Sequence, residues 1–250
     1  MECCVGPGFL IFGLLMIYGG VTRYLLYQKI SNTPTSKVRA AAVGLVELFG
    51  KAKCKDELSS PISKAKCIFW RITGEYYKSG KGGGWKSLYK KESANQFYLE
   101  DDTGKMLVEP RGAEIDIPVD LQSTGHLTDK GFLGVLSQKK LDDRVLAHID
   151  ADAEFGKIMR GRAAELRVTE YYIAEGDPLY VLGSAVPIPG ASSAVAHENL
   201  IMQQGNVEKF MYIGDSGESK VKDRMKGGMF WMFLLGIGLS CIGIFIIFGA

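Results

Sequence analysis

The chain has 250 residues, and its 30 Lys and Arg residues nearly balance its 28 Asp and Glu residues, giving a formal net charge of +2. A nucleic-acid-binding domain normally carries a concentrated basic face, so this balance argues against a nucleic-acid partner. Hydrophobic residues make up 46% of the sequence. Their distribution along the chain is more informative than their number.

Two apolar segments lie at the ends of the chain. Residues 5–22 and residues 227–250 contain no charged residue, and about 18 such residues are enough to cross the hydrocarbon core of a bilayer. A cleaved signal peptide would have a basic start and a small-residue cleavage site, whereas this chain begins with Met1 and Glu2. We therefore predict transmembrane helices at residues 5–27 and 227–249, and a soluble domain at residues 28–226.

Basic residues flank both predicted spans on the side of the central domain. Lys and Arg next to a span remain on the cytoplasmic side of a membrane. The central domain is therefore expected in the cytoplasm, with both termini on the opposite side. The residues that carry this prediction are Arg23, Lys29, Lys37, Arg39, Lys220, Lys222, Arg224 and Lys226. We interpret them as orientation signals, and recognition of anionic headgroups is the alternative.

The central domain begins with strand-like sequence. "KAKCIFWRITGEYY" (64–77) is rich in aromatic and β-branched residues, which favour strands. The glycine-rich "KSGKGGGWKSLYKK" (78–91) follows and predicts a hairpin loop leading into another strand, because a phosphate-binding loop would instead open a helix. "QFYLE" (96–100) and "KMLVEP" (105–110) alternate polar and apolar residues.

The segment "DDTG" (101–104) between those two runs predicts a tight turn in which Gly104 adopts a positive φ angle. A calcium loop is the alternative, but its characteristic ligand spacing is absent. The acidic residues are therefore explained by the turn alone.

The second half of the domain mixes loop, helix and strand. Residues 119–138 are predicted to be a loop, and the four-residue spacing of Val145 and Ile149 indicates a helix. Residues 164–188 and 192–213 predict further strands, and Asp215 followed by Glu218 predicts an N-capped helix leading to the second span. The fold class is therefore two transmembrane helices flanking a mainly β (α+β) cytoplasmic domain, with an OB-like barrel as one architecture.

Catalytic and metal-binding motifs are not found. Cys54 and Cys67 are the cysteines of the central domain, and without a C-x-x-C motif they predict thiols rather than a zinc or redox site. His126, His148 and His197 are isolated in sequence, and there is no G-x-S-x-G motif. We expect no cofactor and no metal, and we favour a non-enzymatic role over an unrecognised enzyme assembled from distant residues.

Three blocks in this order between two spans resemble the GIDE-domain family, which includes the mitochondrial ubiquitin ligase activators: "SPISKAKCIFWRI" (60–72), "FYLEDDTGKMLVEPRGAEI" (97–115) and "EYYIAEGDPLYVLGSA" (170–185). The best-known members are RING-type E3 ubiquitin ligases in which a zinc-binding RING follows the second span. This sequence lacks the Cys/His array of a RING. The resemblance therefore implies a RING-less accessory or interaction module, with E3-ligase-related activity suggested by the family name only. It also implies a domain in the intermembrane space, which differs from the cytoplasmic side expected from charge.

The most family-specific block supplies the predicted interaction site for an unknown protein partner. It comprises Asp101, Asp102, Gly104, Arg111 and Gly112, a polar and tightly turned set. Arg111 is expected to pair with a neighbouring carboxylate.

Two alternatives place binding elsewhere. An OB-like barrel could bind a peptide, a lipid or a nucleic acid. Its surface aromatic residues would be Trp70, Tyr76, Tyr77 and Trp85, although these rings could equally pack within the sheet. Gly236 and Ser240 form a small-xxx-small pair, a pattern that supports helix association, so a homo-oligomer could form through them.

Overall fold

A computed structural model describes residues 5–128, 139–162, 164–191, 196–205, 210–215 and 218–248. The chain divides into two compact units, one formed by residues 1–35 with 216–250 and the other by residues 36–215. The first unit contains the apolar ends of the chain and the second contains the strands.

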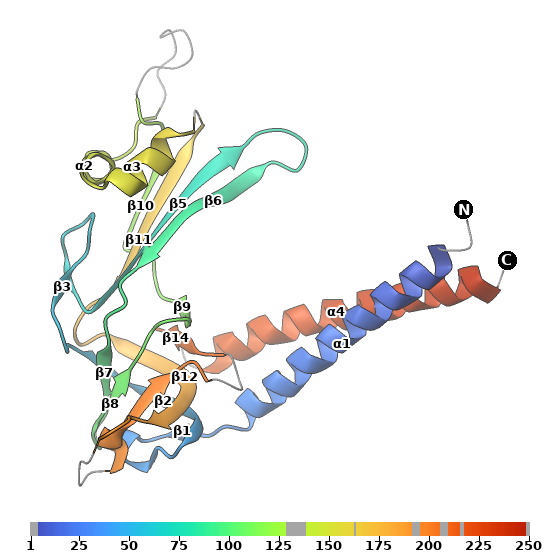
Figure 1. The fold of residues 1–250 in the computed structure, drawn as a ribbon, viewed down its shortest axis with the longest axis horizontal. Helices are drawn as coiled ribbons and strands as arrows, with labels where there is room; N and C mark the ends of the chain where they lie inside the picture. The colour runs from blue at the N-terminus through green and yellow to red at the C-terminus, as the bar shows by residue number, and fades with distance from the viewer. Residues whose placement is uncertain are drawn as a thin grey trace. The chain divides into compact units, whose positions relative to one another are not determined.

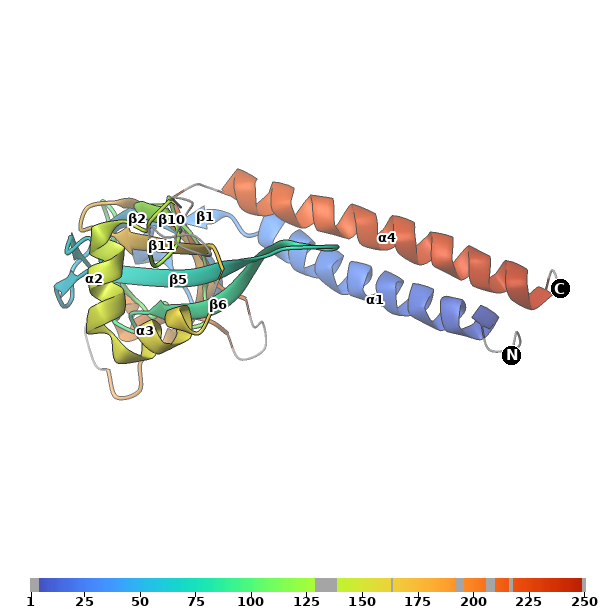
Figure 2. The same cartoon turned by 90° about the horizontal axis from the view of Figure 1, so that it is seen from above.

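The first unit consists of two long helices that lie side by side (Figures 1 and 2). They are α1 (Val5–Ser31) and α4 (Glu218–Phe248). Each contains a stretch long and apolar enough to cross a membrane, Gly6–Leu25 in α1 and Phe230–Ile247 in α4. Helix α4 is described from Glu218, and residues 216 and 217 lie outside the described part, so the prediction that Asp215 is its N-cap stays a prediction.

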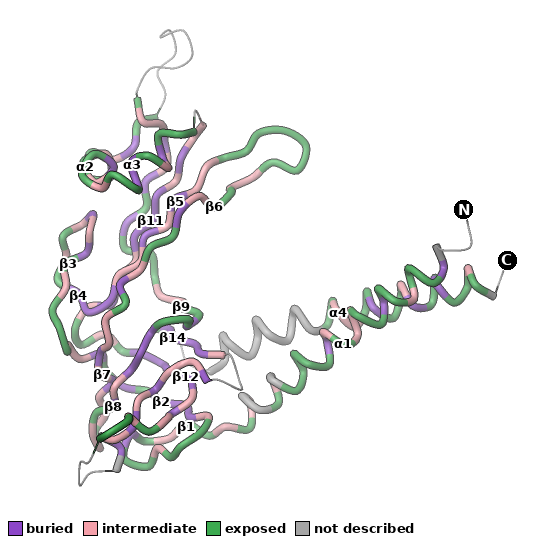
Figure 3. Tube along the Cα trace, in the orientation of Figure 1, coloured by how far each residue is buried: buried purple, intermediate pink, exposed green. Residues whose placement is uncertain are grey.

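Small residues allow the backbones of α1 and α4 to approach closely. A Cβ atom added to Gly13 would lie 2.7 Å from the carbonyl oxygen of Gly236, and one added to Gly243 would lie 2.8 Å from that of Gly6. Large apolar residues of the same helices, including Leu15, are exposed. Figure 3 colours much of the described part of both helices as exposed. This combination of a small-residue contact and an apolar outer surface is typical of membrane helices.

The second unit is built around a closed five-stranded barrel. Around the ring, the strands follow the order β2 (Gly44–Lys53), β7 (Phe97–Glu100), β8 (Lys105–Val108), β13 (Leu200–Gln203) and β12 (Pro178–Pro187), and β12 pairs with β2 to close it. Strands β8 and β13 are parallel, and the other neighbours in the ring are antiparallel. By position along the chain, the order is first, second, third, fifth and fourth. This is the connectivity of an OB-type barrel, so the prediction of an OB-like barrel is confirmed.

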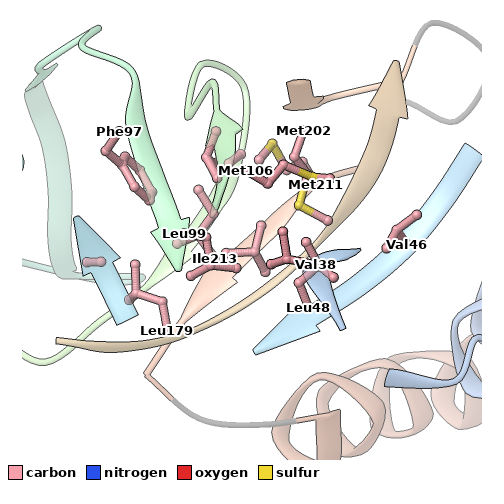
Figure 4. Packing of buried hydrophobic residues seen from close by; sticks show 14 of the residues in the cluster. Val38, Val46, Leu48, Phe97, Leu99, Met106, Leu179, Met202, Met211 and Ile213 are labelled. Carbon is pink, nitrogen blue, oxygen red and sulfur yellow. The ribbon is translucent and has the colours of Figure 1, made fainter. Parts of the chain in front are cut away.

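The barrel interior is filled by alternate residues of its strands (Figure 4). Phe97, Leu99, Met106 and Val108 are fully buried, whereas the residues between them point outward. Each large apolar side chain of this kind contributes about 2 kcal/mol when it leaves water. The alternation predicted for β7 and β8, and the hairpin between them, are therefore confirmed.

Two insertions into the barrel form a second, four-stranded antiparallel sheet with the order β10-β11-β5-β6. The first insertion, between β2 and β7, supplies β5 (Phe69–Lys78) and β6 (Gly84–Glu92), and so confirms the predicted glycine-rich hairpin. The second insertion, between β8 and β12, supplies β10 (Leu121–Gly125) and β11 (Leu166–Ile173).

Helices α2 (Asp143–Ala151) and α3 (Ala153–Arg160) cover one face of this sheet (Figure 2). Val145 and Ile149 are buried there, as their spacing predicted. Asp142 and Asp152 cap the two helices by accepting hydrogen bonds from the backbone N–H groups of Arg144 and Phe155.

The prediction of a loop at residues 119–138 is wrong for residues 121–125, which form β10. Residues 129–138 of that segment lie outside the described part of the chain. Leu121, Ser123 and Gly125 lie on the buried side of β10. The buried hydroxyl of Ser123 has a hydrogen-bond partner, because it accepts a 2.8 Å hydrogen bond from the backbone N–H of Asp142. A strand whose buried side includes Ser and Gly lacks the apolar alternation that predicts strands.

Short elements complete the described part of the chain: β1 (Thr35–Ser36), η2 (Val38–Ala40), β3 (Leu58–Ser59), β4 (Lys66–Cys67), β9 (Glu114–Asp116), η4 (Ala196–Asn199) and β14 (Tyr212–Gly214). Strands β1, β9 and β14 extend the barrel sheet, whereas β3 and β4 pair with each other.

Candidate functional site on the barrel

The β7–β8 turn contains the acidic half of the predicted interaction site. The backbone N–H of Asp101 donates to the carbonyl oxygen of Gly104 at 3.0 Å, which closes the turn. The Asp101 carboxylate accepts hydrogen bonds from the backbone N–H groups of Thr103 at 2.7 Å and Gly104 at 3.1 Å. It also accepts one from the N–H of Val38 at 2.9 Å, and so ties the turn to the segment that precedes β2.

These bonds fix both the geometry and the charge of the turn. Burial by itself would raise the pKa of Asp101, but the bonds from Thr103, Val38 and Gly104 outweigh it and lower that pKa. Asp102 is exposed and forms an ion pair with Lys37. Asp101 therefore holds the turn together, while Asp102 and Lys37 present charge to solvent.

Gly104 is required by a close contact and not by its backbone angle. It does not have the positive φ predicted for it. A Cβ atom at this position would instead overlap Nε2 of His197, a buried side chain of η4. The glycine thus allows the turn to pack against the β12–β13 connection, a contact that no local pattern reveals.

Arg111 pairs with a neighbouring carboxylate, as predicted. Its Nε lies 2.9 Å from Oε1 of Glu109 and its Nη2 lies 3.0 Å from Oε2 of the same residue. The Nε2 of Gln96 donates to Oε2 of Glu109 at 3.2 Å. The pKa of Glu109 is lowered, chiefly by the hydrogen bonds from Arg111.

Gly112 has a φ of +79°, and Nε2 of Gln204 donates to its carbonyl oxygen at 3.2 Å. Arg111 and Gly112 follow β8, whereas Asp101, Asp102 and Gly104 precede it. A four-residue strand separates the two sets by roughly 13 Å at about 3.3 Å per residue. The structure therefore places the predicted site residues at opposite ends of one strand, and their role in binding stays a prediction.

The outer surface of β2, β7 and β8 joins the turn to the rest of the barrel, and we call it the barrel face. Strand pairing sets Lys53, Tyr98 and Leu107 in one row across it and Lys51, Glu100 and Lys105 in the next. The Nζ of Lys105 lies 5.0 Å from the centre of the Tyr98 ring, within the range of a cation–π contact. The barrel face thus presents three lysines, one carboxylate, one aromatic ring and one aliphatic side chain.

Two grooves adjoin the barrel face. One has a volume of about 400 Å³ and is lined by Tyr98, Lys105 and Leu107 together with residues of the β12–β13 connection, Ile188, Ala191, Glu198 and Asn199. The other, of about 420 Å³, includes Asp101 and Asp102 and is further lined by Lys37, Phe49, Gly50, Lys51, Glu100 and Pro178. Phe49 is 51% exposed. Both volumes fall within the range of small-ligand pockets, and each groove combines apolar and charged side chains.

The four aromatic residues proposed for an OB-like surface lie outside the barrel, in β5 and β6. Trp70 and Tyr76 pack against the core beneath α2 and α3. Tyr77 is 43% exposed, and its ring meets that of Trp85 edge to face at 5.5 Å. Trp70 and Tyr76 therefore serve to pack the core, whereas Tyr77 and Trp85 lie at the surface.

Cys54 and Cys67 are free thiols, as predicted, and both line a pocket of about 230 Å³. Burial raises the pKa of Cys67 to about 11 and also raises that of Cys54, so neither is a reactive thiolate at neutral pH. Within the described ranges, no three His, Cys, Asp or Glu side chains gather as metal ligands.

The fold and the barrel face define an OB-type barrel protein with an added helix-covered sheet and an apolar helix at each end. A family model described as "GIDE: E3 Ubiquitin ligase" matches residues 72–248, which run from β5 to α4. This match covers more than half of the chain, and the chain therefore belongs to the GIDE family. Searches among curated proteins and among solved structures returned no match.

Sequence reasoning located the turn but missed the barrel face. The signal was present, because the alternation in "FYLE" and "KMLV" points Tyr98 and Lys105 away from the core. The pairing that sets Lys51 and Lys53 of β2 beside them joins segments far apart in the sequence, and no local pattern encodes it.

Proposed function

We propose that this chain is a membrane-anchored, non-catalytic interaction module of the GIDE family, and that its barrel face binds a segment of a partner protein. The observation that carries the proposal is the pair of grooves that adjoin the barrel face. One groove is lined by Phe49 and the other by Tyr98, so each contains an aromatic side chain. Binding surfaces of this kind recognise partners through aromatic anchors surrounded by polar groups.

The side chains of the barrel face favour a polypeptide as the ligand. Rows of outward side chains along paired strands match the two-residue repeat of an extended peptide. Lys51 and Lys105 flank Glu100 across neighbouring strands, so the face offers charged contacts of both signs. Phe49 and Tyr98 provide apolar contacts at its two sides.

The membrane anchor rests on α1 and α4. Both helices contain a candidate span, and their outward residues are large and apolar. We place residues 28–226 in the cytoplasm because basic residues flank both spans on that side. A single cysteine introduced as Val119→Cys, at a position that is 50% exposed, in a chain lacking the native cysteines would test this orientation by labelling with a membrane-impermeant thiol reagent before and after permeabilisation.

The family description favours one partner class, because it names E3 ubiquitin ligases. We propose that the partner belongs to a ubiquitin-like conjugation system or is one of its targets. Ligase activity itself is the second candidate. It would appear as ubiquitin transfer by the purified chain with activating and conjugating enzymes, and such transfer would overturn the non-catalytic role.

The test uses a photo-crosslinking amino acid at single positions in the full chain, in its native membrane. Positions 49 and 98 report on the barrel face. Position 119 is the matched control, because Val119 is 50% exposed and lines neither groove. We expect one protein to be captured from positions 49 and 98 and not from 119, with capture lost when Lys51→Glu and Lys105→Glu are added. Equal capture from position 119, or capture that survives the charge reversal, would contradict the proposal.

A further inference from the structure

The hairpin formed by β5 and β6 lies outside the barrel face and has an unusual composition. Residues 76–91 contain five lysines and no Asp or Glu. The same stretch contains Tyr76, Tyr77, Trp85 and Tyr89, and its turn includes four successive Gly or Lys positions from Gly80 to Gly83. It therefore combines positive charge, aromatic rings and a small, adaptable tip.

The hairpin extends beyond the sheet to which it belongs. The ladder between β11 and β5 ends at the pair of Leu166 and Tyr76, with one further hydrogen bond of 2.8 Å from the N–H of Tyr77 to the carbonyl oxygen of Glu165, whereas β5 and β6 remain paired out to Lys78 and Gly84. The tip is thus a two-stranded arm (Figure 1). Gly80 and Gly82 have positive φ angles and no neighbouring atoms within 4 Å of an added Cβ, so the turn is open on its sides.

The lysines at the tip differ from those at the base. Lys90 pairs with Glu92 at 3.2 Å and Lys91 pairs with Asp152 at 3.3 Å. Lys78, Lys81 and Lys86 are exposed and have no ion-pair partner within the parts of the chain that the structure describes. Their charge is therefore available to an anionic ligand.

One arginine packs against an aromatic ring at the base of the arm, and another packs against a ring within it. The guanidinium of Arg167 lies 4.3 Å from the centre of the Trp85 ring, and that of Arg162 lies 4.9 Å from the centre of the Tyr76 ring. These arginines cover one face of each ring, so a base could stack only on the opposite face. Trp and Tyr beside lysines are typical of membrane–water interfaces.

We propose that the tip of the β5–β6 hairpin is a second membrane contact, and that Lys78, Lys81 and Lys86 bind the headgroups of anionic phospholipids while Tyr77 and Trp85 lie at the lipid–water boundary. The inference rests on the proposed membrane anchor, which keeps a bilayer within reach of the domain. Each lysine near an anionic surface strengthens binding by about fivefold, so the three together give roughly a hundredfold preference for anionic over neutral lipid.

The test compares the full chain in nanodiscs of phosphatidylcholine alone with the same chain in nanodiscs that also contain phosphatidylserine. Hydrogen exchange of residues 76–88 is the readout, and the amides of β2 and β12 report whether the fold is intact. The variant Lys78→Gln, Lys81→Gln, Lys86→Gln removes the tip charges. A matched variant, Lys66→Gln, Lys140→Gln, Lys157→Gln, removes the same charge from other exposed positions.

We expect exchange in the hairpin to slow about tenfold or more when phosphatidylserine is present, and only in the wild type and the matched variant. Equal exchange in the two lipids would overturn the inference. So would protection produced by a single-stranded oligonucleotide or by inorganic phosphate in neutral nanodiscs at the same level, because the ligand would then not be a lipid surface. If the chain failed to elute with nanodiscs, the anchor itself would be wrong. If it did elute but its hairpin stayed unprotected, only this inference would be wrong.

Discussion

Arg111 donates hydrogen bonds to both carboxylate oxygens of Glu109, at 2.9 Å from Nε to Oε1 and 3.0 Å from Nη2 to Oε2. The Glu109 side chain is 11% exposed and that of Arg111 is 69% exposed. An inward carboxylate at the end of β8 is thus neutralised by an outward guanidinium. The arginine that the sequence suggested as a binding residue has a structural partner, and these two roles can be separated by experiment.

The first prediction concerns acid stability. The pKa of Glu109 is lowered in the folded state, so the pair stabilises the fold above the unfolded pKa of about 4.5 and its contribution is lost as pH falls below that value. Arg111→Ala should therefore lower the thermal stability at pH 7 and flatten its dependence on pH between about 5 and 3. Thermal unfolding of the detergent-solubilised chain measures both effects. Arg39→Ala, at another exposed position, is the control, and an unchanged pH dependence in Arg111→Ala would contradict the prediction.

The second prediction concerns a buried carboxylate in β11. Glu170 is fully buried and accepts hydrogen bonds from the backbone N–H groups of Ile62 at 2.7 Å and Ser63 at 2.9 Å. Glu170→Gln keeps the shape but turns an amide donor toward one of these N–H groups, so it should destabilise the domain by about 3 kcal/mol. Denaturant unfolding checks the value, with the exposed Glu175→Gln as the control. A loss below about 1 kcal/mol would show that the segment containing Ile62 and Ser63 does not need Glu170 for its stability.

The third prediction concerns the contact between Gly104 and His197. A methyl group at position 104 would overlap the imidazole, so Gly104→Ala should destabilise the barrel by about 2 kcal/mol. His197→Ala creates space, and the double variant should therefore lose less stability than the two single losses added together. A double-mutant cycle of unfolding free energies measures this coupling. Additive losses would mean that the turn and η4 do not depend on each other.

The fourth prediction concerns His148, whose ring packs 5.2 Å from that of Phe155. Burial lowers the pKa of His148 in the folded state, so the fold favours the neutral ring. Stability is therefore present above the unfolded pKa of about 6.5 and falls as pH drops below it. The variant His148→Gln should remove the part of the pH dependence between about 7 and 5. Melting temperatures across this range test it, and an unchanged slope in the variant would exclude His148 as the source.

The elements that sequence patterns located are those whose signal is local. The hairpins around "DDTG" and the glycine-rich segment, and the helix containing Val145 and Ile149, follow from periodicity and turn residues. Strand β10 was missed because its buried side includes Ser123, which is satisfied by a hydrogen bond from a distant backbone. Closure of the barrel depends on a parallel contact of β8 with β13 and on the pairing of β2 with β12, and neither is encoded by neighbouring residues.

The same distinction applies to the candidate site. Glycine at position 104 is compatible with a turn, yet its physical reason lies in His197. Gly236 and Ser240 were singled out for a homo-oligomer from their spacing alone. Within the helical unit, a Cβ added to Gly13 would overlap the backbone of both residues, so this small-residue surface already faces α1 of the same chain. A spacing rule identifies a surface that packs closely but does not identify its partner.

The fifth prediction follows from that contact. A Cβ atom at position 236 would lie 2.8 Å from Cγ1 of Ile17, whereas one at position 238 would meet nothing within 4 Å. Gly236→Leu should therefore separate α1 from α4, and Gly238→Leu should not. Cysteines introduced as Gly6→Cys and Ile247→Cys, in a chain lacking the native cysteines, report the pairing, because Cβ of residue 6 would lie 2.8 Å from Cγ1 of Ile247. We expect oxidative crosslinking within the chain to fall several-fold in Gly236→Leu and to remain unchanged in Gly238→Leu. If Gly236→Leu abolished an oligomer while the crosslink within the chain persisted, the small residues would act between chains and not within one.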